Sequence, residues 1–283
     1  MQGLYWLASY PRSGNTWLRL MLDSYQRGGG AVDINALSWA SQMSGLMYSR
    51  SFADDVLGVS TGDLTPAEVL ALRPTVLRAV CGRAAGPVAL KTHDMRLRLP
   101  GGDWLLPADV TLGGVCLVRD PRDVALSLAR LLDCPVERAI AVMAEPGHRR
   151  GASVRRQGGQ LVTLLGSWSE HVASWLDPHP FAVAVIRYED MRRDPATALG
   201  TLLPHLGYPV DPGRVAAAVA ETALETLRRQ EAENGFSENL SRNRFFGAGA
   251  VGGWRSGLTA VQADRICRDH GAVMRRLGYL DGP

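Results

Sequence analysis

Three short stretches of the chain combine cations, hydroxyl groups and a histidine in a way that suits the binding and transfer of an anionic group. Residues 10–17 read Tyr-Pro-Arg-Ser-Gly-Asn-Thr-Trp, residues 91–93 read Lys-Thr-His, and residues 118–127 read Val-Arg-Asp-Pro-Arg-Asp-Val-Ala-Leu-Ser. Arginine, lysine and hydroxyl groups bind phosphate or sulfate oxygens, and histidine exchanges a proton near neutral pH. The three stretches therefore predict an anion site that includes a histidine suited to acid-base chemistry.

The first stretch is expected to lie between a strand and a helix. Residues 4–9 form a short apolar run of strand length, and apolar side chains recur at helical spacing from 18 to 25. A loop at this place presents the unpaired amides and the positive dipole end of the helix to a ligand. The alternative is an ordinary strand-to-helix turn in which Asn15 or Thr16 is the N-cap.

Residues 12–16 supply the chemistry of this loop. Arg12 adds a positive charge, and Ser13 and Thr16 add hydroxyl donors. Gly14 lets the backbone approach an anion closely. The loop therefore predicts binding of a phosphate or sulfate ester, although it is not a Walker A loop, because the pattern Gly-x-x-x-x-Gly-Lys-Ser/Thr is missing.

Two further predicted strands deliver the other groups. The apolar run 87–91 ends in Lys91 with His93 just beyond it, and the run 111–118 leads into Arg119. Ligands of open parallel sheets collect at the carboxyl ends of the strands. A histidine beside a lysine at that place therefore favours chemistry over a purely structural role.

The residues after 118 have the features of a helix start. Asp120 can cap a helix that Pro121 opens, and Ser127 lies two turns along it. Arg119 and Ser127 together are suited to a second anion. The alternative is an Arg-Asp ion pair at the helix entry.

Alternating strands and helices predict an α/β fold, a P-loop-like and doubly wound parallel sheet flanked by helices. The expected strands are 4–9, 87–91, 111–118 and 181–186. Beyond the two helices already named, helices are expected at 65–73, 161–176, 199–206, 215–227 and 259–277. Thr65 and Glu68 form a capping box for the first of these, and Pro74 is expected to end it.

Length and composition indicate one soluble globular domain over residues 1–283. The net charge of +3 is too small and scattered to predict nucleic-acid binding, and no apolar run approaches the ~18 residues of a membrane span. The four cysteines form no Cys-x-x-Cys pair, which favours free thiols over disulfides or a metal site. No signal peptide is recognisable, so a cytoplasmic protein is expected.

Three segments have little regular pattern: 28–63, 145–159 and 234–248. Such segments either line and cover an acceptor site or simply wrap the surface. We expect acceptor specificity and mobile acceptor-site loops there, with 145–159 as a candidate lid.

Taken in order, the motifs resemble those of sulfotransferases that use 3′-phosphoadenosine 5′-phosphosulfate (PAPS). Besides the three opening stretches, the resemblance rests on Arg-Tyr-Glu-Asp-Met at 187–191 and Gly-Ala-Val-Gly-Gly-Trp-Arg at 249–255. It covers most of the chain. Residues 8–17 look similar to bacterial enzymes that sulfate secondary metabolites, including glycopeptide antibiotics.

The resemblance implies a site for PAPS, and for its product adenosine 3′,5′-bisphosphate (PAP). The residues implied for the 5′-phosphosulfate are Arg12, Ser13, Gly14, Asn15, Thr16 and Trp17, with Trp17 near the adenine. Arg119 and Ser127 would hold the 3′-phosphate, and Tyr188 would contact the base. The glycine-rich stretch with Gly249 and Gly252 would close over the 3′-phosphate.

The resemblance also implies the catalytic groups. His93 would be the base that takes the proton of an acceptor hydroxyl, Lys91 would steady the sulfuryl group, and Arg12 would neutralise the leaving phosphate. Sulfuryl transfer, like phosphoryl transfer, is expected to pass through a loose in-line transition state, so positioning and charge neutralisation dominate and no metal is needed. The expected partner is a small-molecule hydroxyl acceptor, with a homodimer left open.

Two departures from the family pattern affect these expectations. Arg12 stands where the family often has lysine, which changes a compact ammonium into a planar guanidinium. The late Arg-Lys-Gly element is replaced by Gly247-Ala248-Gly249, and Arg242 or Arg244 is the expected substitute. Two alternatives stay open at this point: a small-molecule kinase of the P-loop type, and a nucleotide-binding homologue without catalysis.

Overall fold

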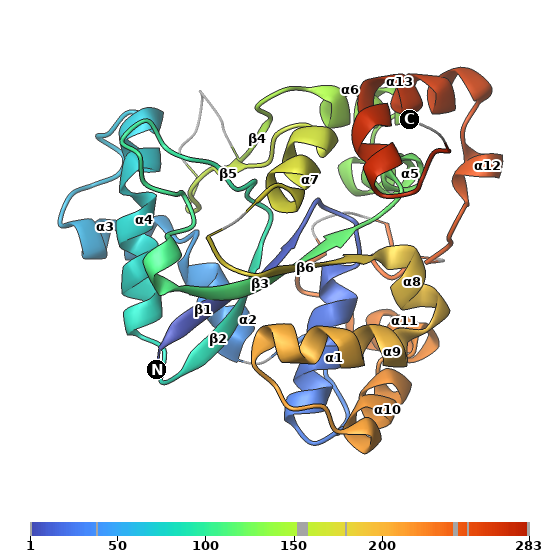
Figure 1. Ribbon diagram of the computed structural model, residues 1–283, viewed down its shortest axis with the longest axis horizontal. Coiled ribbons are helices and arrows are strands. Elements are labelled where there is room, and N and C mark those ends of the chain that lie inside the picture. Colours follow the sequence, from blue (N-terminus) through green and yellow to red (C-terminus); the bar gives the residue numbers. More distant parts are fainter. Residues whose placement is uncertain are drawn as a thin grey trace.

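The central sheet of the computed structural model has four parallel strands in the order β2-β1-β3-β6 (Figure 1). The strands are β1 (Gly3–Ser9), β2 (Pro87–Thr92), β3 (Thr111–Val118) and β6 (Val183–Arg187). The structure describes residues 2–37, 39–151, 158–178, 180–239, 243–247 and 249–281. Because every pair in this sheet is parallel, the chain leaves all four strands at the same edge.

Helices and short connections complete the fold. The helices are α1 (Asn15–Gln26), α2 (Trp39–Leu46), α3 (Arg50–Leu57), α4 (Pro66–Gly82), α5 (Pro121–Leu132), α6 (Val136–Ala144), α7 (Trp168–Leu176), α8 (Tyr188–Arg193), α9 (Pro195–Leu202), α10 (Pro212–Glu221), α11 (Leu224–Asn234), α12 (Trp254–Gly257) and α13 (Ala260–Arg276). The 3₁₀ turns are η1 (Ala108–Val110) and η2 (Leu203–Leu206). A small antiparallel ribbon joins β4 (Arg149–Arg150) to β5 (Thr163–Leu164).

Side chains of the central strands alternate between two hydrophobic cores, as the twofold repeat of a strand requires. Along β1, Trp6 and Ala8 enter the larger core, which includes residues of α3 to α7 and α13. Leu7, between them, enters the second core with residues of α1 and α8 to α10. The sheet therefore lies between two helical layers, and the α/β prediction is confirmed.

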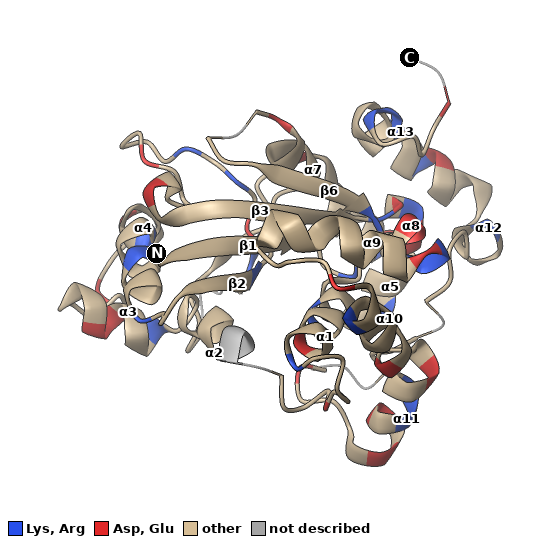
Figure 2. Ribbon diagram, turned by 60° about the horizontal axis from the view of Figure 1, so that its bottom comes forward, with Lys and Arg blue, Asp and Glu red and all other residues tan. Residues whose placement is uncertain are grey.

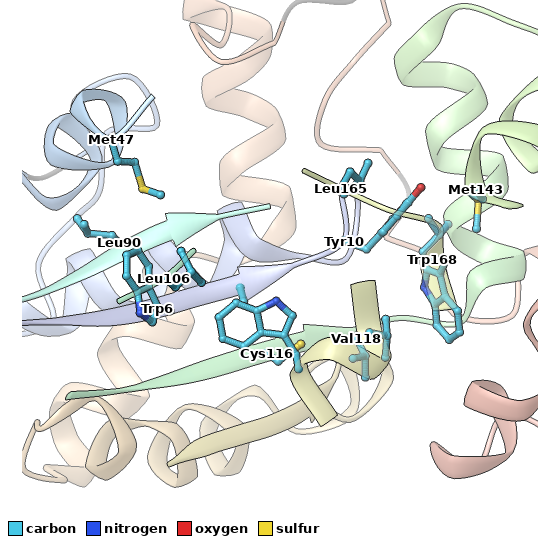
Figure 3. Packing of buried hydrophobic residues seen from close by; sticks show 14 of the residues in the cluster. Trp6, Tyr10, Met47, Leu90, Leu106, Cys116, Val118, Met143, Leu165 and Trp168 are labelled. Carbon is cyan, nitrogen blue, oxygen red and sulfur yellow. The ribbon is translucent and has the colours of Figure 1, made fainter. Parts of the chain in front are cut away.

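Figure 3 shows part of the larger core, in which Trp6, Leu90 and Cys116 come from three neighbouring strands. Trp168 and Trp175 of α7 are also fully buried. Their seven-residue spacing therefore serves packing. The four cysteines are free thiols; Cys81 and Cys116 are buried.

Most predicted elements are observed close to their expected positions. The third strand has the expected bounds, and Asp120 caps α5 by accepting a hydrogen bond from the amide of Arg122. Thr65 and Glu68 form the expected capping box of α4, and the helix predicted at 259–277 is α13 with Thr259 as its cap.

The prediction that Pro74 ends a helix is wrong, because α4 continues to Gly82. Proline costs an internal hydrogen bond in a helix. Here Val76, Leu77 and Val80 lie beyond it and are buried in the larger core. Tertiary packing therefore outweighs the local penalty.

Two other helix predictions are too long. The helix predicted at 161–176 begins only at Trp168, because Gly166 has a left-handed φ of +67° and Ser167 caps the first turn. The helix predicted at 215–227 is divided into α10 and α11 around Thr222, whose carbonyl accepts a hydrogen bond from Trp17 Nε1 at 2.9 Å.

The irregular segments differ from one another. Residues 28–63 contain two short helices, α2 and α3, although their sequence shows no clear period. Met47 and Phe52 of this segment are buried in the larger core, so part of it is structural. Segments 145–159 and 234–248 contain residues outside the described ranges; their described parts hold only β4 and the last residue of α11 as regular structure.

Candidate active site

A cavity of about 650 Å³ opens at the carboxyl edge of the sheet. Its wall includes all three predicted catalytic residues: Arg12, Lys91 and His93. It also includes the predicted cofactor residues Gly14, Asn15, Thr16, Trp17, Arg119, Ser127, Tyr188, Arg244 and Gly249. The structure therefore brings together groups that lie far apart in the sequence.

The first loop turns sharply into α1. Gly14, with φ +99°, is the N-cap and has no side-chain cap, so neither Asn15 nor Thr16 has that role. Asn15 instead donates from Nδ2 to the carbonyl of Leu7 at 2.8 Å, which fixes the loop to the end of β1. A Cβ at Gly14 would lie 2.7 Å from the Tyr188 ring, so this position also requires glycine for space.

Arg12 spans from this loop to α5. Its Nε donates to Ser127 Oγ at 2.9 Å, its Nη2 donates to the carbonyl of Phe245 at 3.1 Å, and its guanidinium lies 4.5 Å from the Phe245 ring centroid. Burial, followed by the charges of Arg119 and Arg130, lowers the pKa of Arg12 to about 10, so it remains a cation at neutral pH. Arg12 therefore lies at the α5 side of the cavity.

Arg119 and Tyr188 form the next part of the wall. Arg119 donates to the carbonyls of Arg12 and Ala250 at 3.0 and 2.9 Å, and its guanidinium stacks 4.3 Å from the Tyr188 ring centroid. Tyr188 donates to the carbonyl of Gly249 at 3.2 Å. These bonds hold the glycine-rich stretch against the strand ends.

Asp123 fixes the rest of that stretch. Its carboxylate accepts hydrogen bonds from the amides of Gly252 and Trp254 at 2.7 and 2.8 Å. The hydrogen bond from the Gly252 amide to Asp123 thus shapes the turn of this stretch.

Two predicted cofactor residues, Gly252 and Ser13, are absent from the described cavity wall. The Oγ of Ser13 is buried without a hydrogen-bond partner among the described residues.

His93 has the tautomer that a general base needs. Its Nδ1 lies 2.6 Å from the carbonyl oxygen of Ser9, and since a carbonyl only accepts, Nδ1 must carry the proton. Nε2 is then the unprotonated nitrogen. Burial and the charge of Lys91 hold the pKa of His93 well below its usual range, so the imidazole is neutral at pH 7.

Lys91 lies beside an acidic partner that the sequence did not suggest. Its Nζ forms an ion pair with Glu238 Oε2 at 3.3 Å, and Glu238 also binds Arg19 of α1. Burial and the charge of Arg19 lower the pKa of Lys91 to about 8, against the opposing effect of Glu238. Lys91 therefore loses its proton close to physiological pH.

A buried network of hydrogen bonds fixes Asp94, the residue that follows the Lys-Thr-His segment. Asp94 accepts from Arg73 Nη1 and Nη2 at 3.0 and 2.7 Å, from the Tyr48 hydroxyl at 2.8 Å and from the Leu164 amide at 2.7 Å. Arg73 and Asp94 are 2% and 0% exposed. The residue next to His93 is thus fixed by an ion pair and two further hydrogen bonds.

Five charged residues of the cavity wall were not predicted from the sequence: Asp123, Arg130, Arg150, Arg192 and Glu238. Arg130 follows Ser127 by three residues on α5, which places both on one helix face, and that spacing was a usable signal. Arg150 and Glu238 come from the irregular segments and carry no such pattern. Figure 2 shows Lys and Arg, in blue, beside α8 where β3 and β6 end.

Not every predicted residue can be placed. Arg242 lies outside the described residues, whereas Arg244 is exposed and belongs to the cavity wall. Within the described ranges, no three His, Cys, Asp or Glu residues are grouped so that they could hold a metal ion. No helix of the described chain combines the length and apolarity that crossing a membrane requires.

Comparison with known proteins identifies the family. Residues 4–278 match the sulfotransferase domain. The chain is 26% identical to sulfotransferase 1A1 of Bos taurus over 264 residues, which cover 90% of this chain and 78% of that protein. It is 27% identical to cytosolic sulfotransferase 16 of Arabidopsis thaliana over 282 residues, covering 92% of this chain and 72% of the relative.

A solved structure has the same fold. Retinol dehydratase in complex with androsterone and inactive cofactor PAP aligns with a TM-score of 0.60 at 19% identity, covering 96% of this chain and 80% of that chain. The family match over nearly the whole length also removes the small-molecule kinase alternative. The chain therefore belongs to the sulfotransferase family of enzymes.

Proposed function

We propose that this sulfotransferase transfers a sulfuryl group from PAPS to a hydroxyl group of a small molecule, with His93 as the base. The observation that carries the proposal is the presence, in one cavity, of a neutral histidine with an unprotonated Nε2 and of arginines whose described partners are all uncharged. A base next to unbalanced positive charge suits the transfer of an anionic group to a hydroxyl.

The residues fit such a donor. Arg12 and Arg119 are largely buried, and within the described chain their hydrogen bonds go only to a hydroxyl and to carbonyls. Buried cations without a carboxylate partner are costly unless an anion binds them. Ser13 Oγ, next to Arg12, is buried and has no hydrogen-bond partner among the described residues, so it is a further donor or acceptor at the loop. The solved complexes of retinol dehydratase and of mouse sulfotransferase SULT7A1 with PAP support the same donor.

In the proposed mechanism, His93 Nε2 accepts the proton of the acceptor hydroxyl as its oxygen bonds to sulfur. Lys91 supplies positive charge to the sulfuryl oxygens. Arg12 and the first amides of α1 neutralise the phosphate that takes the electron pair of the breaking sulfur-oxygen bond. PAPS supplies the activated sulfuryl group when bound, and the residues supply position, charge and one proton acceptor.

The acceptor class is the finer part of the proposal. Solved relatives hold androsterone or retinol, which supports a small-molecule acceptor. Residues 8–17 are similar to bacterial enzymes that sulfate secondary metabolites, including glycopeptide antibiotics. This similarity supports a secondary metabolite as the acceptor. Action in the cytoplasm and assembly as a homodimer stay predictions, and light scattering of the purified chain would measure the latter.

The proposal is tested first by calorimetric titration with PAP beside ATP, without magnesium. We expect micromolar binding of PAP and weak binding of ATP. Absence of PAP binding would contradict the proposed donor, and the titration needs no knowledge of the acceptor.

Turnover of PAPS with a panel of phenols and alcohols then tests the base. His93→Ala should lower kcat by about 10²–10⁴-fold while PAP affinity is retained. His205→Ala, which changes an exposed histidine of η2 outside the cavity wall, is the matched control. A His93→Ala protein with full turnover would show that His93 is not the base.

A further inference from the structure

Arg130 is one of four cavity arginines, with Arg150, Arg192 and Arg244, whose side chains form no hydrogen bond or ion pair with a described residue. It lies near the end of α5 and belongs to the cavity wall. Its carbonyl accepts a hydrogen bond from Asn243 Nδ2 at 2.8 Å. An arginine held at a cavity wall without a partner is available to a ligand.

Arg130 shares a helix face with Ser127. Residues three apart on a helix are neighbours, and Ser127 Oγ is the group that receives Arg12 Nε at 2.9 Å. Arg130 is also near enough to Arg119 for the charge of Arg119, after burial, to lower the pKa of Arg130. The α5 side of the cavity thus holds three arginines whose charges act on one another, and one of them, Arg12, donates to Ser127 Oγ.

None of these three cations is in an ion pair within the described chain, whereas Lys91 in the same cavity is paired with Glu238. Asp123 raises the pKa of Arg130, and Glu231 raises that of Arg12, but neither carboxylate is in direct contact with these arginines. The positive charge is therefore only partly offset. Repulsion among like charges is relieved best by a ligand group with more than one negative charge, such as a phosphate dianion.

Residues 247 and 249 offer no alternative cation. Both are glycine, and Gly249 has a left-handed φ of +58° with its carbonyl bound to the Tyr188 hydroxyl. The glycine-rich stretch therefore contributes backbone close to this end of the cavity but, at these positions, no charge. Any cation at this end of the cavity therefore comes from other residues of the wall, among them Arg130, Arg192 and Arg244.

We infer that Arg130 binds the 3′-phosphate of the nucleotide, together with Arg119 and Ser127, and so supplies from α5 the charge that residues 247 and 249 lack. This inference rests on the proposed use of PAPS. It makes α5 the main source of the 3′-phosphate site, in place of the expectation that Arg242 or Arg244 substitutes.

The inference is tested by titrating two nucleotides, PAP and adenosine 5′-monophosphate, which lacks the 3′-phosphate. Arg130→Gln should weaken PAP binding about 10- to 100-fold, the range of a charge-assisted hydrogen bond, and leave binding of adenosine 5′-monophosphate unchanged. Arg130→Lys, which keeps the charge, should recover part of the loss. Arg138→Gln, an exposed arginine of α6 outside the cavity wall, should leave both affinities unchanged.

Each other outcome has a distinct meaning. Equal losses for both nucleotides, or an unchanged PAP affinity, would overturn the role of Arg130 while wild-type PAP binding still supports the proposed donor. A loss confined to PAP in Arg244→Gln but absent in Arg130→Gln would move the role to Arg244. Wild-type protein that binds neither nucleotide would overturn the proposed function and this inference with it.

Discussion

Two groups of buried arginines in this chain are built in opposite ways. Below the Lys-Thr-His segment, Arg73 is 2% exposed and its two terminal nitrogens donate to Asp94 at 3.0 and 2.7 Å. At the α5 side of the cavity, Arg12 and Arg119 are largely buried too, but their described partners are a hydroxyl, carbonyls and aromatic rings.

This contrast separates the cations that serve the fold from those that serve a ligand. Burial alone would lower the pKa of Arg73, but Asp94 outweighs it, so that the pKa of Arg73 is raised. For Arg12 no such carboxylate contact exists among the described residues, and its pKa is lowered to about 10. A balanced pair is complete without a ligand, whereas unbalanced cations gain from an added anion.

The largest expected effect comes from breaking the balanced pair. Asp94→Ala leaves Arg73 as an uncompensated buried charge and removes the acceptor of Tyr48 and Leu164, so the free energy of unfolding should fall by about 3–5 kcal/mol. Urea unfolding measures it. The control, Asp190→Ala, breaks the exposed Arg193–Asp190 pair and should cost less than about 1 kcal/mol. Equal losses would show that the buried pair has no special structural role.

Removing an unbalanced cation should affect binding more than stability. Arg119→Ala should weaken PAP binding by about 10- to 100-fold, because a charge-assisted contact is lost. Without nucleotide, Arg119→Ala should lower the free energy of unfolding less than Asp94→Ala does, because the substitution relieves the repulsion between Arg119 and Arg12. Calorimetry and urea unfolding of the same preparations check both statements. Unchanged PAP affinity would remove Arg119 from the site.

Lys91 is intermediate between the two groups, because it is paired yet has a pKa of about 8. If the charge of Lys91 is needed, kcat/KM should fall as the pH rises through about 8. Because the pKa of His93 is well below 6.5, the fall of kcat/KM on the acidic side should occur below pH 6.5. The sign for stability is opposite: the unfolded state binds more protons between pH 8 and 10.5, so the free energy of unfolding should rise there. Lys91→Arg should remove the basic limb; a limb that persists would assign it to another group.

The smallest expected effect is that of Glu238. Its carboxylate raises the pKa of Lys91 against burial, so Glu238→Gln should move the basic limb of the kcat/KM profile to lower pH by about one unit or less. The pH profile of this variant, measured beside Glu233→Gln of α11, tests the contact. A shift of the limb to higher pH would show that Glu238 does not stabilise the charged form of Lys91.

Local sequence was enough to specify the capped helices and the order of the chemical groups. Thr65 and Asp120 cap helices as their spacing predicts, because a cap needs only residues within one turn. Strand lengths and the parallel sheet also followed from short apolar runs alternating with helices. From these, the meeting of residues 12–17, 91–93 and 119–127 at one sheet edge was predictable.

Which of these groups became partners depended instead on the tertiary structure. The continuation of α4 through Pro74, the contact of Arg12 with Ser127 and the pairing of Lys91 with Glu238 each join residues to neighbours supplied by distant segments. Contacts between distant segments leave no periodic pattern or fixed spacing in the sequence, so they could not be predicted from it. Packing energy and the geometry of long side chains fixed them, and with them the excess positive charge of the cavity.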